Sequence, residues 1–139
     1  MPVPAEYERA SDQFYKYLMD ARDAAGLSST HTAYTMTQGV MQAFRRRLSF
    51  NQAIAFANLL PICLRALFVS DWNTDEPIKS FQDRVAMTKE VQALRSEHNF
   101  SPETAIRDVA QALRRHIDEA AFDRLLAGFP DGAVEFWRT

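Results

Sequence analysis

Several residue types that mark whole classes of protein are scarce in this 139-residue sequence. The single cysteine, Cys63, excludes an internal disulfide framework, so the folded state depends on its apolar core. Glycine occurs only four times, and neither a Gly-rich phosphate loop nor a nucleophile elbow is present. The net charge of −2 gives no global basic field to attract nucleic acid or an anionic membrane. What remains, with 47% hydrophobic and 24% charged residues, is the composition of a globular domain.

No hydrophobic run is long enough to predict a membrane-spanning helix, which needs about 20 mostly apolar residues. The best candidate, residues 53–69, is interrupted by Asn58, Pro61 and Arg65. The N-terminal residues lack the basic start and apolar stretch of a secretory signal. We therefore expect a cytoplasmic protein that does not associate with membranes.

Apolar residues recur at helical spacing along most of the chain. Met36, Val40, Phe44 and Leu48 step by four, and residues 106–117 carry a similar stripe. Ser49, followed three residues later by a glutamine, predicts a capping box at a helix start. The sequence thus predicts an all-α fold, a compact bundle of about eight helices. The predicted core consists of Phe14, Leu18, Val40, Phe44, Leu48, Leu60, Val85, Val109, Leu113, Ile117, Leu125 and Phe129.

The chain contains an internal duplication. Residues 40–48 and 109–117 are identical at five of nine positions, at a spacing of 69. Further upstream the spacing is 67, where Phe14 aligns with Phe81 and Leu18 with Val85. Self-similarity of this kind indicates a repeated structural unit. We predict one domain, residues 1–139, made of two four-helix units at 11–72 and 78–137 that are joined by a connector at 73–77.

Several segments of this sequence match the pattern of a known family. They are the run Leu-Leu-Pro-Ile-Cys-Leu-Arg-Ala-Leu-Phe at 59–68, Trp72, the run at 81–85, the second-copy run at 112–117 and Phe129-Pro130. On these segments the chain resembles the uncharacterised bacterial family called domain of unknown function 2267, from about residue 11 to residue 137. The family pattern has glycine before the connector tryptophan, where this chain has Asp71. The resemblance implies a duplicated helical fold, and it implies no activity and no functional residues.

Two basic clusters occupy equivalent places in the two predicted units. They are Arg45, Arg46 and Arg47, and Arg114, Arg115 and His116. Two matched patches of this kind could bind anions or the phosphates of nucleic acid. Alternatively, each cluster lies at a helix C-terminus, where cations offset the helix dipole by roughly 0.3–1 kcal/mol. Because consecutive helical residues face different directions, we favour the second interpretation and do not expect nucleic acid as a partner.

No metal, cofactor or catalytic site follows from the sequence. Residues 71–75 resemble the opening of a calcium loop, but Glu76 stands where glycine is required and Gln82 where a bidentate glutamate is required. The three histidines are scattered, without the spacing of a zinc site. Cys63 lies in an apolar helical segment and is predicted to pack as a small hydrophobic residue.

The aromatic residues suggest an interaction surface. Two adjacent aromatic residues cannot both face one core from a single helix. We therefore expect Phe136 or Trp137, and one of Tyr15 and Tyr17, at a surface, with Trp72 as a further candidate for partner binding.

The leading hypothesis is a non-enzymatic helical module that binds an unknown protein partner or itself. One alternative is weak anion or nucleic-acid binding through the paired arginine clusters. Another is an enzyme whose site is assembled in space. Salt distinguishes these hypotheses, because added salt steeply weakens binding to phosphates and does not weaken apolar association.

Overall fold

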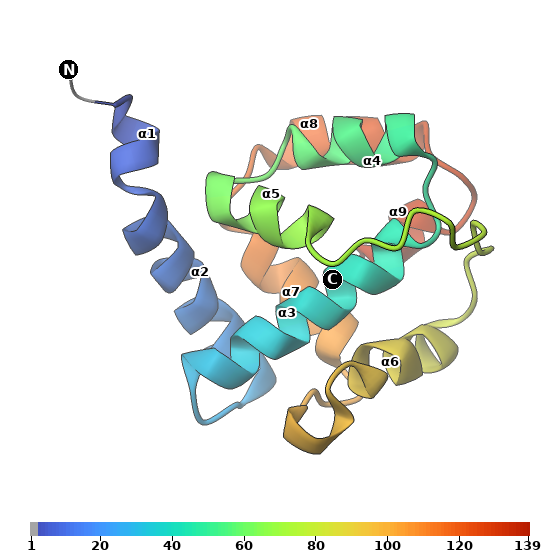
Figure 1. Cartoon of the computed structure of the whole chain (residues 1–139), viewed down its shortest axis with the longest axis horizontal. Helices are drawn as coiled ribbons and strands as arrows, with labels where there is room; N and C mark the ends of the chain where they lie inside the picture. Colours follow the sequence, from blue (N-terminus) through green and yellow to red (C-terminus); the bar gives the residue numbers. More distant parts are fainter. Residues whose placement is uncertain (1–2) are drawn as a thin grey trace.

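A computed structural model describes residues 3–139, whose regular structure is helical throughout, without any strand (Figure 1). The all-α bundle expected from the sequence is confirmed over this part of the chain. The helices are α1 (Ala5–Glu8), α2 (Ala10–Ala25), α3 (Thr30–Arg45), α4 (Phe50–Ala57), α5 (Ile62–Val69), α6 (Arg84–Ala93), the 3-10 helix η1 (Ser96–His98), α7 (Ala105–Arg114), α8 (Glu119–Ala127) and α9 (Ala133–Phe136).

The apolar stretch at 53–69 is divided between α4 and α5, which meet at Pro61. Among residues 3–139, no helix has both the length and the apolarity needed to cross a membrane.

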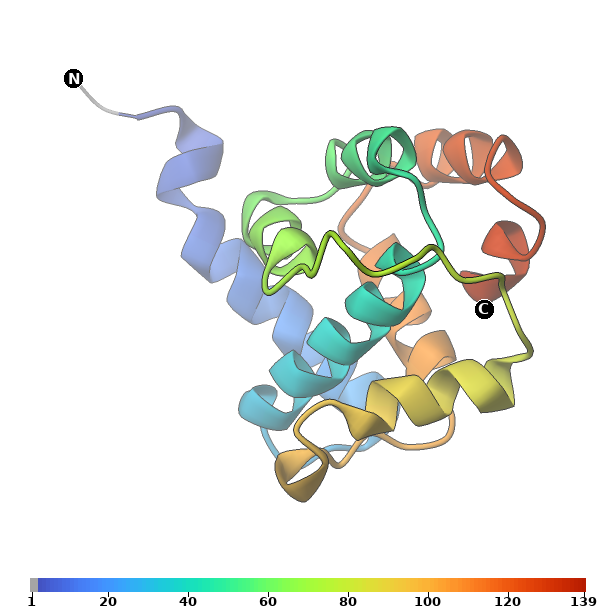
Figure 2. The ribbon, with the colours of Figure 1, turned by 45° about the vertical axis from the view of Figure 1, so that its right-hand side comes forward.

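Helix α3 is the centre of the fold. Every side chain from Thr35 to Arg45 is buried, because α2, α5, α6 and α7 all pack against this helix (Figure 2). A helix surrounded in this way can bury polar as well as apolar faces, provided that its polar groups find partners. The predicted stripe of Met36, Val40, Phe44 and Leu48 is confirmed as buried.

The two halves of the chain are interleaved. Helix α2 packs along α7, and α3 packs along α6. The first helix of each predicted unit thus contacts the second helix of the other unit. Helices α4 and α8 lie side by side at one end of the bundle (Figures 1 and 2). Neither half therefore buries its apolar surface without the other.

Aromatic rings fill the space between these layers. The Phe44 ring lies 4.8 Å from Phe56, 5.0 Å from Phe136 and 5.3 Å from Trp137 between centroids. Phe122 lies 5.6 Å from Trp137 in an edge-to-face arrangement. Tilted and edge-to-face contacts are the favoured geometries for aromatic pairs. The central core is consequently built by α3, α4, α8 and α9 together.

Most of the predicted core is confirmed. Leu18, Val40, Phe44, Leu48, Leu60, Val109 and Leu113 are buried, while Phe14, Ile117, Leu125 and Phe129 are half-buried against the core. The prediction that Val85 belongs to the core is wrong, because its side chain is 69% exposed. Helix α6 starts one residue before Val85 and buries Met87, Thr88 and Val91 instead.

The helix caps follow the sequence in both halves. Ser49 Oγ accepts a hydrogen bond from the backbone of Gln52, and the Gln52 side chain accepts one from the backbone of Ser49, so the predicted capping box is present. At a spacing of 69, Asp118 caps α8 by accepting from the backbone of Ala121. The upstream alignment pairs Leu18, which is buried, with Val85, which is exposed. The division into two equivalent units therefore stays a prediction.

Replacing Gly39 by alanine is expected to lower the free energy of unfolding by about 1 kcal/mol. An added Cβ would lie 2.8 Å from the carbonyl oxygen of Val91, so α3 and α6 must move apart. Overpacking costs about 1–3 kcal/mol, and the better helix propensity of alanine returns about 1 kcal/mol. Urea unfolding measures the difference. Gly128→Ala is the control, since its nearest neighbour would lie at 3.7 Å. A Gly39→Ala protein more stable than the unaltered one would rule out this close helix contact.

Candidate functional site

The first residue of the first basic cluster closes the end of a helix. Arg45 is only 4% exposed, and its Nη1 donates to the carbonyl oxygens of Phe68 at 2.9 Å and Ser70 at 2.8 Å. These carbonyls lie at the C-terminal end of α5, where helices lack internal donors. The Arg45 guanidinium also lies 4.9 Å from the ring centre of Trp72. Burial, reinforced by the charge of Arg46, lowers the pKa of Arg45 below its ordinary value.

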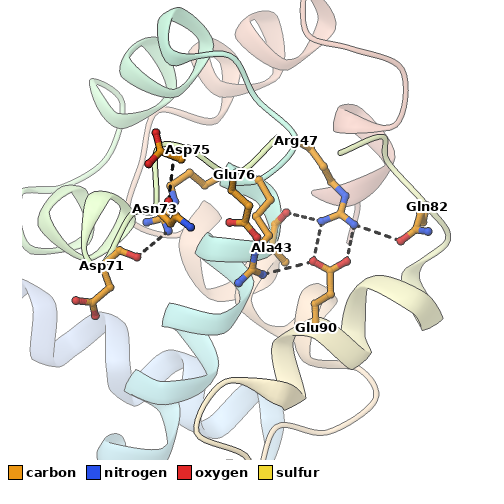
Figure 3. A network of polar contacts seen from close by, with 10 residues as sticks. Ala43, Arg47, Asp71, Asn73, Asp75, Glu76, Gln82 and Glu90 are labelled. Atoms are coloured by element: carbon orange, nitrogen blue, oxygen red, sulfur yellow. Dashed lines mark hydrogen bonds and ion pairs between the residues drawn. The ribbon is translucent and has the colours of Figure 1, made fainter. Parts of the chain in front are cut away.

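Arg47 forms a buried ion pair with Glu90 (Figure 3). The Arg47 side chain is fully buried, and its Nη2 and Nη1 lie 2.6 Å and 3.1 Å from the two carboxylate oxygens of Glu90. Nη1 also donates to the carbonyl of Ala43, and Nε donates to that of Ser80. These contacts join the end of α3 to the segment before α6 and to α6 itself.

Burial alone would raise the pKa of Glu90. The hydrogen bonds and charge of Arg47 outweigh burial, with smaller contributions from Lys79 and Arg46, so the pKa of Glu90 falls below its ordinary value. Arg46 itself lies 3.4 Å from Glu90 and 3.8 Å from Glu76. The carboxylate of Glu90 is thereby held in its ionised form between two guanidinium groups.

The second cluster makes matching contacts. Arg114 donates through Nε and Nη2 to the carbonyl of Trp137, just past the end of α9, and pairs with Asp123 at 3.0 Å. Arg114 follows Arg45 by the repeat spacing of 69, and Trp137 follows Phe68 by the same spacing. Two arginines at the repeat spacing thus bind carbonyls at the ends of two helices, α5 and α9.

His116 and Arg115 both contact α2. His116 Nε2 lies 2.7 Å from Asp20 Oδ2, and its Nδ1 lies 3.4 Å from the side-chain amide of Gln13. Arg115 reaches the other oxygen of Asp20 at 3.3 Å. A carboxylate beside an imidazole can serve proton transfer. Here both ring nitrogens have partners on α2, which is the geometry of a contact joining α7 to α2.

These contacts use the basic clusters inside the fold. Among the six predicted anion-binding residues, the side chain of Arg115 is 71% exposed. The side chain of Arg47 is fully buried. The guanidinium of Arg47 donates through Nε, Nη1 and Nη2 to oxygens within the fold, so none of its nitrogens is left free for a phosphate. Anion binding by these six residues stays a prediction, and their contacts weigh against it.

The five predicted partner-binding aromatics divide between surface and core. Tyr15 is 52% exposed and Trp72 is half-buried, while Tyr17, Phe136 and Trp137 are completely buried. The expectation that Phe136 or Trp137 lies at the surface is wrong, because α9 ends at Phe136 and Trp137 lies beyond it. The constraint of helical spacing does not apply across that end, so both rings face inward, 5.2 Å apart.

Tyr17 is accommodated in the core by a polar partner. Its hydroxyl lies 2.9 Å from the Thr37 hydroxyl. Burial raises the pKa of Tyr17 above its ordinary value, although the hydrogen bond with Thr37 acts in the opposite direction. The folded chain therefore offers Tyr15 and Trp72, and not the three buried rings, to a partner.

A groove of about 930 Å³ lies beside the start of the chain. One wall is α1 and the first turns of α2, residues 5–16, which we call the N-terminal arm. The other walls are the turn between α4 and α5, with Leu59 and Ile62, and the turn between α7 and α8, with Ile117. Both ribbon views show α1 projecting at the edge of the bundle, beyond the other helices (Figures 1 and 2). The groove is an open, partly apolar channel between three segments that are distant in sequence.

The N-terminal arm presents one charged face to this groove. Glu6, Arg9, Asp12 and Lys16 all line the groove, are all exposed, and follow one another at helical spacing with alternating sign. None of the four forms an ion pair with any residue from 3 to 139. Helix α1 buries no residue at all. The first turn of the arm, α1, therefore has no buried side chain to anchor it.

Other chemistry is not assembled around the groove. In the described part of the chain, no group of three or more His, Cys, Asp or Glu side chains is arranged to hold a metal ion. Cys63 is half-buried, and its thiol lies 3.6 Å from the carbonyl of Ala10, which ties α5 to the arm.

Comparison with known proteins gives a family and no assigned activity. No curated protein matches the sequence significantly. The model of a family described as an uncharacterized conserved protein, DUF2267, matches residues 14–136. The match includes both basic clusters, most of α2 and the buried aromatic core except Trp137. This chain belongs to the DUF2267 family.

Proposed function

We propose that this chain is a non-enzymatic, cytoplasmic helical module that binds a protein partner in the groove beside its N-terminal arm. The observation that carries the proposal is the exposed charged face of the arm, with four charges that find no ion-pair partner among residues 3–139. Apolar side chains inside the groove and charged side chains at its edge correspond to the core and rim of a protein interface.

The arm has a physical reason to acquire a partner. A short helix gains little stability in water from its own hydrogen bonds, and tertiary packing normally supplies the rest. Helix α1 buries no side chain against the rest of residues 3–139. A partner in the groove would contact the arm on one side and Leu59, Ile62 and Ile117 on the other.

The mixed charge of the groove favours a protein over nucleic acid or a small anion. Four basic residues, Arg9, Lys16, Arg65 and Arg115, alternate with the acidic residues Glu6, Asp12 and Asp118. Arg65 donates to the carbonyls at the end of α4, and Arg115 pairs with Asp20. Polyanion binding needs an excess of free cations, which this lining does not offer.

Site-specific photocrosslinking in the native cell tests the proposal. A photoreactive residue in place of Glu6, in the groove, should give a discrete protein adduct that the same residue in place of exposed Lys89 on α6 does not give. The purified adduct partner should bind the chain, and Arg9→Glu should weaken that binding about tenfold, whereas Lys89→Glu should not. Equal adducts at both positions, or none at Glu6, would overturn the proposal. Adducts removed by nuclease would support the anion-binding alternative instead.

A further inference from the structure

We propose that the partner is a second copy of this chain, with the two N-terminal arms antiparallel and each arm lying in the groove of the other copy. The inference rests on the proposed function, because it uses the same groove and names its occupant. A twofold axis would pass close to Ala10 and Ser11, midway along the charged face.

The order of charges along the arm specifies this arrangement. In an antiparallel pair of identical helices, residues that face each other have numbers with a nearly constant sum. Glu6 then meets Lys16 of the second copy, and Arg9 meets Asp12 of the second copy. Symmetry repeats both contacts, so all four charges of each arm are paired. A parallel arrangement would place each charge against its own kind, which is unfavourable.

The dimensions of the arm agree with this pairing. Ten residues separate Glu6 on α1 from Lys16 on α2, about 15 Å at the rise of a helix, with a turn at Arg9 between the two helices. Ala10, at the midpoint and lining the groove, leaves space for a close approach of the two helices.

Charge reversal on the full chain tests the pairing by sedimentation equilibrium. The unaltered protein should dimerise, while Arg9→Glu and Asp12→Arg should each weaken dimerisation about tenfold or more, because each reversal sets like charges together twice. A mixture of the two variants should dimerise again, since Glu at 9 would face Arg at 12 and Asp12 would face Arg9. Lys89→Glu is the matched control and should leave the dimer intact.

Each other outcome has a definite meaning. A protein that stays monomeric at all concentrations up to about 200 μM would overturn the inference, because most specific dimers form below that concentration. So would a dimer indifferent to both reversals, or a mixture that stays monomeric. A monomeric chain whose Glu6 position crosslinks to a different protein would overturn the inference and leave the proposed function standing. Circular dichroism of each variant verifies that the helices are retained.

Discussion

Replacing Phe44 by alanine should lower the free energy of unfolding by about 3–5 kcal/mol, the largest loss we expect from a single core substitution in this chain. The Phe44 ring lies within 6.4 Å of five other aromatic rings and is completely buried. Its removal leaves a cavity that the surrounding rings cannot fill without leaving their own packing. Native domains are stable by only about 5–15 kcal/mol, so this loss is a large share of the total.

Urea unfolding followed by circular dichroism measures the effect. Phe50→Ala is the matched control, because Phe50 is 55% exposed and its loss should cost below about 1 kcal/mol. If Phe44→Ala leaves no folded protein to measure, Phe44→Leu should still be less stable than the control. Equal losses at Phe44 and Phe50 would show that α3 is not the centre of the core.

Replacing Glu90 by glutamine should cost about 3 kcal/mol near neutral pH, because it leaves the buried Arg47 guanidinium without its counter-charge. The loss should be near the lower end of the range for buried pairs, since the Glu90 side chain keeps 18% exposure. Replacing both residues, as Arg47→Met with Glu90→Leu, should cost less than Glu90→Gln alone, because no unpaired charge then remains in the interior.

The cost of Glu90→Gln should also depend on pH. The pKa of Glu90 is lower in the folded chain than its ordinary value, about 4.3 for glutamate. Its stabilisation is therefore complete above the ordinary pKa and is lost as the pH falls through the folded pKa. The stability difference between the two proteins should shrink below about pH 4. Exposed Glu103→Gln serves as control. A difference that is the same at neutral and strongly acid pH would show that Glu90 and Arg47 are not paired.

The helical core was predictable because its signal is local. The four-residue steps from Met36 to Leu48 and the pair Ser49 and Gln52 each specify a helix face or a helix start within a few residues. Val85 was assigned to the core because it aligns with the apolar residue Leu18. The alignment does not show where α6 begins, and that start decides which face of the helix is buried.

The role of the basic clusters was not predictable from the same kind of signal. Arg45 and Arg114 bind carbonyls more than twenty residues away, and those contacts depend on where α5 and α9 end. The repeat spacing shared by the arginines and by Phe68 and Trp137 was the available clue, since it linked each cluster to an aromatic residue downstream. The charged face of the arm was also visible in the sequence, but the groove beside it depends on two distant turns.

The position of Trp137 in the core constrains how the chain folds as it is synthesised. Phe44 and Phe56 leave the ribosome well before their packing partners Phe136 and Trp137. Until then, the inner face of α3 lacks two of the five aromatic partners of Phe44 and stays accessible to chaperones. The core therefore forms only after residue 137 has left the exit tunnel, and a stalled nascent chain would present α3 as an exposed apolar helix.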